Sequence, residues 1–317
     1  NRYSLELDYY NKRTKDLLLN RPIPGTAGET RLENVGEIEN KGFEFTINSL
    51  NIDKPDFTWS TNLTISANKN KVISIGDGQE FITLDNPNGS SGPSIRIIPG
   101  YPAPAYLGAT YLGTYRTTAE IDADGVVGSV LGGPRYVDLD GNGAINQLDF
   151  IVHGDPNPDF YGGLRNTLTY KDFTLDFFFH GSYGNEILNA AYHLGYFGRD
   201  PRSNLLPIVK DRWTTSNQNS DIPRAGSSFG NYQQRSDVSY QDGSFLRLKN
   251  VTLTYDLDIP GMKRASVYVT GNNLLLFTKF THGDPEQSNY GDGLAQGVAN
   301  GGYPYNSSFA LGFNLTL

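Results

Sequence analysis

A twelve-residue segment, 138–149, has the residue types and spacing of a loop that binds a divalent cation. Its positions 6 and 8 are Gly143 and Ile145, and Ala144 at position 7 would offer its backbone carbonyl, as in an EF-hand loop. Side-chain oxygens stand at positions 1, 3, 5, 9 and 12: Asp138, Asp140, Asn142, Asn146 and Asp149. Clustered carboxylates repel one another unless a cation lies between them, and Ca²⁺ takes about six to eight oxygen ligands.

The segment therefore predicts a Ca²⁺ site with the ligands Asp138, Asp140, Asn142, Ala144, Asn146 and Asp149. Position 12 is Asp149 where an EF-hand loop has Glu, so the carboxylate reaches less far and we expect a modest affinity. The alternative is that the segment is only a turn rich in Asp and Asn.

No other group of residues predicts catalysis. The absence of Cys excludes disulfides, thiolate zinc sites and Cys nucleophiles. The four His residues are scattered, and no H-E-x-x-H or G-x-S-x-G motif occurs. The acidic run Asp122–Gly125 matches only part of a calcium loop and predicts a turn. With 26 basic and 34 acidic residues, a net charge of −8, the chain lacks the basic face of a nucleic-acid binder. We expect neither an enzyme nor a nucleic-acid partner.

The composition is typical of an all-β, extracytoplasmic protein. Gly and Tyr are abundant, at 36 and 20 residues, and only 19% of residues are charged. The sequence contains no run of about 18 apolar residues, so it predicts no transmembrane helix. The mean hydropathy of −0.45 fits a soluble protein. It also fits an outer-membrane β-barrel, in which only alternate strand residues face lipid.

Alternation of apolar and polar residues is the dominant pattern and predicts long strands. It is clearest in 309–317, where Phe309, Leu311 and Phe313 alternate with Ala310 and Gly312. A tilted strand of about 9–11 residues crosses a bilayer. We predict about ten strands: Arg2–Lys12, Asp16–Ile23, Glu37–Asn48, Phe57–Asn70, Tyr106–Tyr115, Asp159–Tyr170, Phe173–Gly181, Phe245–Asp256, Ala265–Phe277 and Phe309–Leu317.

The connections between these strands are either very short or very long. Tyr170–Phe173 predicts a two-residue turn, whereas three connections are long: Gly76 to Asp159, Asn185 to Gly243 and Thr281 to Tyr305. Loops beyond about 12–15 residues are uncommon in compact domains, but short periplasmic turns and long extracellular loops are usual in outer-membrane barrels. A phase change between Leu248 and Val251 predicts a β-bulge. Two short helices are predicted in the second long connection, at Glu186–Phe197 and Leu205–Thr214.

The polar face of the predicted strands consists of small side chains. Its members include Ser60, Asn62, Thr64, Ser66, Ala310, Gly312 and Asn314. They would underfill a narrow barrel, whereas they fit the wall of a wide lumen. The first strand, Arg2–Lys12, has no Pro, bulge or inward charge to protect its edge. We therefore expect that the chain does not close its own barrel and that both edges pair with further strands.

Six segments stand in a characteristic order: Asn34–Phe45 (NVGEIENKGFEF), the loop 138–149 followed by Gly154–Phe160 (GDPNPDF), Phe173–Asn185 ending in FHGSYGN, Ser244–Leu253 (SFLRLKNVTL), Gly271–Leu274 (GNNL) and Pro304–Tyr305. Together they resemble the C-terminal barrel portion of the SusC/RagA family of TonB-dependent outer-membrane transporters. The order and spacing match over nearly the whole chain.

The resemblance implies an antiparallel transmembrane β-barrel of about 22 strands, with long extracellular loops and a lumen filled by an N-terminal plug. Residues 1–317 would be the C-terminal part of that barrel, with the plug domain and the TonB box upstream. The implied function is TonB-dependent import of oligosaccharides or peptides across the outer membrane. The implied partners are a SusD-like surface lipoprotein that acts as a lid, the TonB complex, the rest of the barrel and the lipid bilayer.

Three alternatives remain. The first is a secreted calcium-binding, all-β glycan-binding or adhesion protein, which would need no detergent. The second is a calcium-dependent polysaccharide hydrolase, for which no acid pair stands out. The third is a siderophore or vitamin receptor of the same general barrel type. The segments Asn40–Glu44 and Gly154–Phe160 argue against it, because they resemble the SusC/RagA family. We favour a glycan substrate because the family leans that way, with loop tyrosines as candidates for stacking on sugars: Tyr101, Tyr106, Tyr232, Tyr290 and Tyr303.

Overall fold

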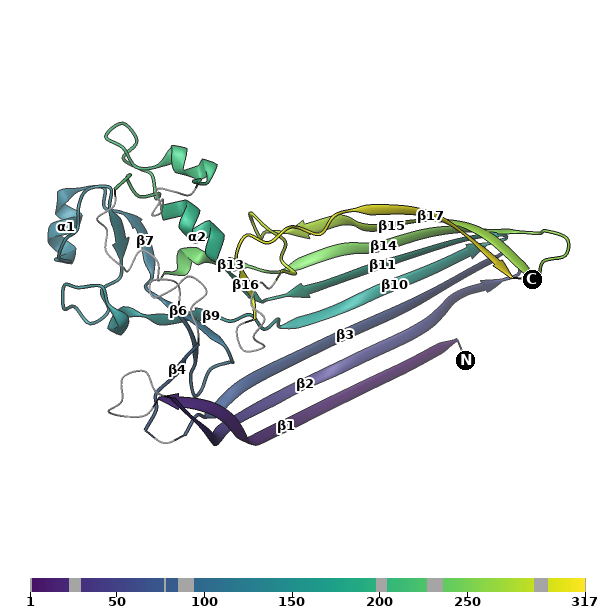
Figure 1. The fold of residues 1–317 in the computed structure, drawn as a ribbon, viewed down its shortest axis with the longest axis horizontal. Coiled ribbons are helices and arrows are strands. Elements are labelled where there is room, and N and C mark those ends of the chain that lie inside the picture. The colour runs from purple at the N-terminus through teal and green to yellow at the C-terminus, as the bar shows by residue number, and fades with distance from the viewer. Residues whose placement is uncertain are drawn as a thin grey trace.

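The protein is built around one antiparallel sheet of eight long strands. The computed structural model describes residues 2–22, 30–76, 78–84, 94–197, 204–226, 236–287 and 296–316. The strands pair in the order β1-β2-β3-β10-β11-β14-β15-β17 and run side by side along the long axis of the molecule (Figure 1). Their bounds are β1 Tyr3–Pro22, β2 Thr30–Lys54, β3 Phe57–Ser74, β10 Phe160–Tyr170, β11 Phe173–Tyr183, β14 Phe245–Leu257, β15 Arg264–Thr278 and β17 Ser308–Thr316.

The sheet has eight strands where the sequence predicted about ten. The predicted strands Arg2–Lys12 and Asp16–Ile23 fall on one strand, β1, which continues through a register shift between Thr14 and Leu17. Ile23 lies outside the described residues. The predicted strand Tyr106–Tyr115 lies outside the large sheet. It forms two four-residue strands of smaller sheets, β6 (Ala105–Gly108) and β7 (Tyr111–Thr114). Alternation alone does not separate a long irregular strand from two strands, or a barrel strand from a loop strand.

The connections confirm the predicted alternation of short and long. Two residues separate β2 from β3 and β10 from β11, and residues 258–263 join β14 to β15. The three long connections, 75–159, 184–244 and 279–307, all leave from the opposite end of the sheet (Figure 1). We call these two ends the turn end and the loop end. The predicted bulge is also confirmed, because the pairing of β14 with β15 shifts between Leu248 and Asn250.

One face of the sheet is apolar from strand to strand. Seven residues that lie directly opposite one another form a continuous row: Leu5, Ile47, Leu63, Leu164, Phe179, Leu248 and Leu275. Because side chains alternate between the two faces of a strand, the residues in register with this row point the same way. This apolar face carries exposed side chains such as Leu5 and Leu7, so it is a surface and not a core.

The opposite face is polar. The neighbouring register row is Ser4, Asn48, Asn62, Arg165, Phe178, Asn250, Asn272 and Ser308. Its side chains hydrogen-bond across strands: Asn62 Nδ2 donates to Asn48 Oδ1 at 2.7 Å, and Asn250 Nδ2 donates to Asn272 Oδ1 at 2.9 Å. The small residues that the sequence placed on the polar face lie there.

Aromatic side chains border the apolar face at both ends. At the turn end, Phe57, Tyr170, Phe173 and Tyr255 lie opposite one another in register. At the loop end, the rings of Phe160 and Tyr183 stack at 5.3 Å. Ten residue steps from Phe173 to Tyr183, at about 3.3 Å each, span about 33 Å along the strand. With a tilt of about 40° the span along the membrane normal is about 25 Å, the height of the apolar band of an outer-membrane barrel.

The three long connections pack together into one unit at the loop end. Its central cluster takes residues from each connection: Ile95 and Tyr106 from the first, Leu188 from the second and Val298 from the third. Leu188 also pairs with Val298 between β12 (Glu186–Asn189) and β16 (Val298–Ala299). We call this packed unit the loop unit. It also contains β4 Ile82–Thr83, β5 Ser94–Ile97, β8 Pro134–Tyr136, β9 Ile151–Gly154 and β13 Tyr240–Asp242.

The helices of the loop unit differ from the prediction. The segment predicted as helix Glu186–Phe197 begins as strand β12 and becomes helix α2 only at Ala190–Phe197. The segment Leu205–Thr214 contains a 3-10 helix, η2 (Pro207–Asp211). The predicted turn Asp122–Gly125 is the end of helix α1 (Thr118–Asp124), which Gly125 caps with a φ of 64°. Among the described residues, no helix has the length and apolar character needed to cross a membrane.

Replacing Leu164 with Lys tests whether the apolar face contacts lipid. Leu164 lies between the two aromatic borders, and a Lys at the membrane midplane costs about 2–4 kcal/mol of barrel stability. We expect Leu164→Lys to reduce assembly of the full-length protein, measured as the heat-modifiable band on gels of the membrane fraction. Thr167→Lys places the same charge on the polar face of the same strand and should assemble normally. Equal assembly of both variants would contradict a lipid-facing apolar side.

Candidate functional site

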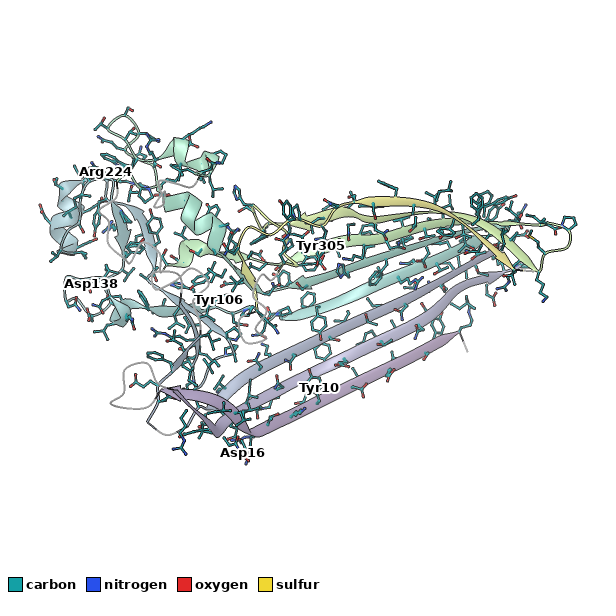
Figure 2. All side chains as sticks on the ribbon, in the orientation of Figure 1. Tyr10, Asp16, Tyr106, Asp138, Arg224 and Tyr305 are labelled. Atoms are coloured by element: carbon teal, nitrogen blue, oxygen red, sulfur yellow. The ribbon has the colours of Figure 1, made fainter. Side chains whose placement is uncertain are left out.

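The predicted cation loop lies in the loop unit, away from the large sheet. It follows β8 and ends in the 3-10 turn η1 (Gln147–Asp149), in the first long connection. Figure 2 labels Asp138 at the side of the molecule opposite the turn end. The site is therefore positioned by the packing of the loop unit.

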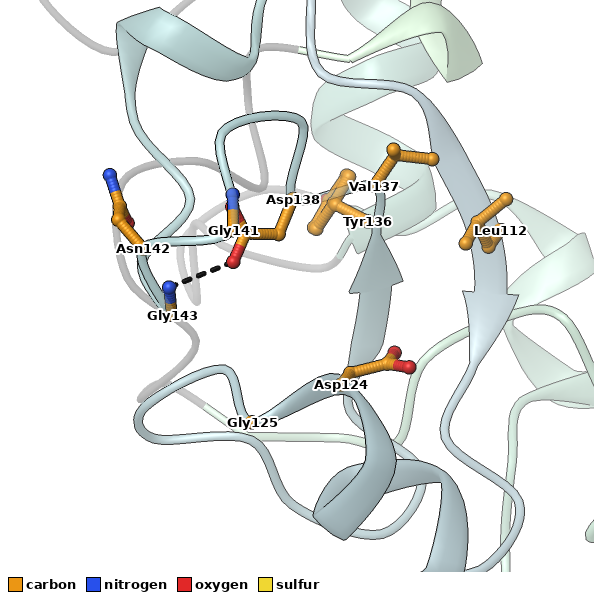
Figure 3. Close-up of a pocket in the computed structure, with 9 residues that line it drawn as sticks. All are labelled: Leu112, Asp124, Gly125, Tyr136, Val137, Asp138, Gly141, Asn142 and Gly143. Atoms are coloured by element: carbon orange, nitrogen blue, oxygen red, sulfur yellow. Dashed lines mark hydrogen bonds between the residues drawn. The ribbon is translucent and has the colours of Figure 1, made fainter.

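Asp138 is held by backbone donors within the loop. Its two carboxylate oxygens accept the N–H of Gly141 at 2.9 Å and the N–H of Gly143 at 2.8 Å; Figure 3 shows the second contact. The turn requires positive φ at both glycines, 71° and 77°. These hydrogen bonds, the one from Gly143 above all, hold the pKa of Asp138 below its ordinary value. Asp138 is therefore ionised at neutral pH.

Two further carboxylates converge on Asp138. Asp149 is fully buried and accepts the N–H groups of Leu139 at 2.8 Å and Asn146 at 2.7 Å. Asp140 is exposed and accepts the N–H of Asn142 at 3.1 Å. Asp138, Asp140 and Asp149 each offer one oxygen, and these oxygens lie within 4.8 Å of one another. Three carboxylates this close can bind a metal ion.

The other three predicted ligands lie in the same loop, but their oxygens accept hydrogen bonds inside it. Asn142 Oδ1 accepts the N–H of Ala144 at 2.8 Å, and Asn146 Oδ1 accepts the N–H of Leu148 at 2.9 Å. The carbonyl of Ala144 accepts from Asn146 Nδ2 at 3.0 Å. The structure thus brings together the three aspartates, and ligation by Asn142, Ala144 and Asn146 stays a prediction.

A pocket of about 540 Å³ separates the cation loop from the end of α1 (Figure 3). The carbonyl of Gly143 accepts the N–H of Val127 at 2.8 Å, which joins the loop to the chain that follows α1. On the far side of the pocket, Asp124 forms an ion pair with Arg135 at 2.7 Å. The pocket gives the loop an open, polar approach for a hydrated ion.

A second charged cluster, which sequence reasoning missed, lies on the polar face of the sheet. Arg247 of β14 and Asp284 of the third long connection are each 2% exposed and meet at 2.6 Å. Glu286 contacts Arg247 and lies 3.3 Å from His180 Nε2. Asp284 also accepts the N–H of Tyr305 at 3.3 Å. This buried ion pair fixes the third connection against the inner side of β14. Arg247 stands within the predicted strand Phe245–Asp256, but nothing in the local sequence marked Asp284, 37 residues away, as its partner.

The loop tyrosines proposed for sugar stacking differ in their accessibility. Tyr106 is fully buried and stacks on Tyr240 at 5.1 Å, so it is a core residue and not a binding residue. Tyr101 and Tyr303 are exposed. Tyr232 and Tyr290 lie outside the described residues.

Glu186 is a partly buried residue at the junction of the sheet and the loop unit. Burial raises its pKa to about 7, and the nearby charges of Asp155 and Asp242 add to the shift. Its Oε2 has no hydrogen-bond partner among the described residues. A protonated Glu186 therefore fits this position better than a charged one.

Comparison with known proteins identifies relatives over the whole chain. Residues 1–183 match the family model described as TonB dependent receptor-like, beta-barrel. TonB-dependent receptors P26 and P3 of Formosa agariphila are 40% and 37% identical over 98% and 99% of this chain. TonB-dependent receptor SusC of Bacteroides thetaiotaomicron is 26% identical over 98% of the chain. The chain spans about a third of the length of these curated relatives, 30–32%.

Solved structures with the same fold extend this result. The structure of the RagAB peptide transporter matches the whole chain with a TM-score of 0.80 at 23% identity, over 34% of its own chain. The RagAB peptide importer in the 'open-open' state matches with a TM-score of 0.77 at 22% identity. At this identity the likeness shows the fold.

The raised pKa of Glu186 predicts a pH-dependent stability. The folded-state pKa, about 7, lies above the ordinary value of 4.5. Stability from the protonated group is therefore complete below about pH 4.5 and is lost as the pH rises toward 7. We expect Glu186→Gln to stabilise the full-length protein by about 1–2 kcal/mol at pH 8, after allowance for solvent screening, and to have little effect at pH 5.

Melting temperatures of both proteins at pH 5 and pH 8 measure this difference. Glu120→Gln is the matched control. The pKa of Glu120 is lowered, first by backbone hydrogen bonds from Arg116 and Thr117, so this group stays ionised over the whole range. An effect of Glu186→Gln that does not change with pH would contradict the prediction.

Proposed function

Because the chain belongs to the TonB-dependent receptor β-barrel family, we propose that it forms wall and extracellular loops of a transporter that imports substrates across the outer membrane. The single observation that carries this proposal is the pair of opposite register rows, one apolar and one polar, across the large sheet. An apolar face about 25 Å tall between aromatic borders suits lipid. The polar face, lined by Asn, Ser and Thr, suits a water-filled lumen.

We further propose that the barrel is completed by strands outside this chain. Strands β1 and β17 are the edges of the large sheet and each has one neighbour within the described residues. Backbone groups at a lipid-exposed edge have no water to bind, so a spanning sheet must close. A barrel of about 22 strands with an upstream plug, as the family resemblance implies, is consistent with a chain that spans a third of its relatives.

The proposed substrate is an oligosaccharide, with a peptide as the second candidate. The exposed Tyr101 and Tyr303 offer aromatic faces in the loop unit, which supports sugar stacking. The likeness to the RagAB peptide transporter favours the second candidate. A SusD-like lipoprotein would contact the loop unit as a lid, and the TonB complex would supply energy through the upstream region.

Transport is tested with the full-length receptor in cells that lack it. We expect that fluorescent hexasaccharides, or decapeptides in a parallel series, enter the periplasm when the receptor and TonB are both present. Deletion of TonB should abolish entry and leave binding at the cell surface intact. Recovery of the receptor as a monodisperse protein without detergent would instead favour a secreted adhesion protein, and entry without TonB would contradict active transport.

We also propose that the cation loop binds Ca²⁺ through Asp138, Asp140 and Asp149. Carboxylate oxygens are the ligands that Ca²⁺ prefers, and backbone donors already hold Asp138 and Asp149 in place. Asn142, Ala144 and Asn146 are the proposed further ligands. The site would stabilise the first long connection and with it the loop unit.

Calcium should raise the melting temperature of the full-length receptor relative to the chelated protein. Binding to the folded state at 100 times the Kd stabilises it by about 2.7 kcal/mol. We expect Asp138→Ala/Asp140→Ala to abolish this shift, whereas Asp122→Ala, on nearby α1, should retain it. Identical melting curves with Ca²⁺ and with chelator would rule the site out.

A further inference from the structure

A groove of about 810 Å³ lies in the large sheet near its loop end. Its lining includes large side chains of the apolar face, among them Ile65, Phe179, Leu246 and Phe277. Phe277 and Leu246 are exposed. The groove is therefore separate from the proposed substrate path, which runs along the polar face.

Two glycines create the groove. Phe45, Ile65, Gly162, Gly181, Leu246 and Phe277 form one register row of the apolar face. Gly162 and Gly181 lie opposite each other in the middle of this row, so backbone forms the floor between bulky neighbours. A Cβ atom at Gly162 would overlap the carbonyl of Thr64, and one at Gly181 would overlap the carbonyl of Phe245. No side chain at these two positions can fill the groove.

The groove is complete within this chain. Its lining comes from β3, β10, β11, β14 and β15, from Ser244 and Lys279 beside β14 and β15, and from Asp242 at the end of β13. Each of these five strands has a neighbour on both sides (Figure 1). Further strands would join at β1 and β17, outside the groove, and would leave it open.

The chemistry of the groove changes along its length. Its middle is apolar, and the stacked rings of Phe160 and Tyr183 form part of the wall near the loop end. Lys279 lies two residues beyond Phe277, and its side chain is 86% exposed. Asp242 approaches Lys279 only to 3.8 Å, at an exposed position where such a pair contributes little. An apolar channel with a cation at its loop end matches an amphiphile with an anionic headgroup.

We propose that this groove binds an acyl chain of an anionic lipid of the outer leaflet, with the headgroup at Lys279. The proposal rests on the membrane orientation in the proposed function, which places the loop end at the outer surface. The occupant is lipid because the apolar face is surrounded by the bilayer, and a groove with a backbone floor admits a flexible chain. The proposed site concerns retention of a specific lipid and not transport of the substrate.

Native mass spectrometry of the full-length receptor in detergent tests the proposal. The probes are dimyristoyl phosphatidylglycerol and dimyristoyl phosphatidylcholine, which differ only in headgroup. We expect the wild type to retain the anionic phosphatidylglycerol about tenfold better than phosphatidylcholine. Leu246→Trp fills the groove and should reduce retention about tenfold. Leu253→Trp is the matched control, because the two leucines are 46% and 47% exposed on the same face of β14. Lys279→Gln should remove the headgroup preference.

Equal retention by the Leu246→Trp and Leu253→Trp variants would overturn the site, as would equal retention of the two lipids by the wild type. Loss of an oligomer in the Leu246→Trp variant, with lipid retention unchanged, would overturn it in favour of a protein interface. Heat-modifiable mobility confirms that the variants assemble, and Ile65→Trp is the second groove-filling variant. Import by the Leu246→Trp receptor should equal that of the wild type, so failure of this proposal and failure of the transport proposal remain distinguishable.

Discussion

The absence of hydrogen-bond partners in hydrocarbon is the constraint on which this structure depends. A strand in lipid must pair on both sides, and a slip of one residue would turn its apolar side chains toward the lumen. Two devices fix the register. Tight turns set the pairing of β2 with β3 and of β10 with β11. The bulge at Lys249 absorbs one residue of β14, so that Leu248 and Val251, three positions apart, both stay on the apolar face.

The same constraint explains which parts of the fold could be predicted. Alternation, strand length and turn length are local consequences of a two-sided sheet. The long strands, the turn before Phe173 and the bulge could therefore be predicted from the sequence. The sequence predicts a gap between strands at residues 13–15, whereas β1 continues past this point with a register shift and a φ of 57° at Asp16. The secondary structure of the loop unit was harder to predict, because its short elements are set by contacts between connections that are distant in sequence. Helix α1 is an exception, because its capping box of Thr117 and Glu120 is a local sequence signal for the start of a helix.

The sites divide in the same way. The three aspartates of the cation loop lie within twelve residues, so their spacing predicted their convergence. Arg247 and Asp284 lie 37 residues apart on a strand and a loop, and only the fold brings them together. Tyr106 shows the converse. It stands in a long connection and was expected at the surface, yet its hydroxyl donates to the carbonyls of Gln296 and Gly297 at 3.0 Å and its ring lies in the core.

The core of the loop unit has a consequence for how such proteins diversify. Ile95, Leu188 and Val298 come from three different connections and pack together in one buried cluster. If one connection were replaced by that of a relative, its core side chains would not fit those of the other two connections. A void or a clash would result where the three meet. New recognition surfaces can therefore arise by changing exposed tips one at a time. Exchange of whole connections between related proteins requires all three connections to be replaced together.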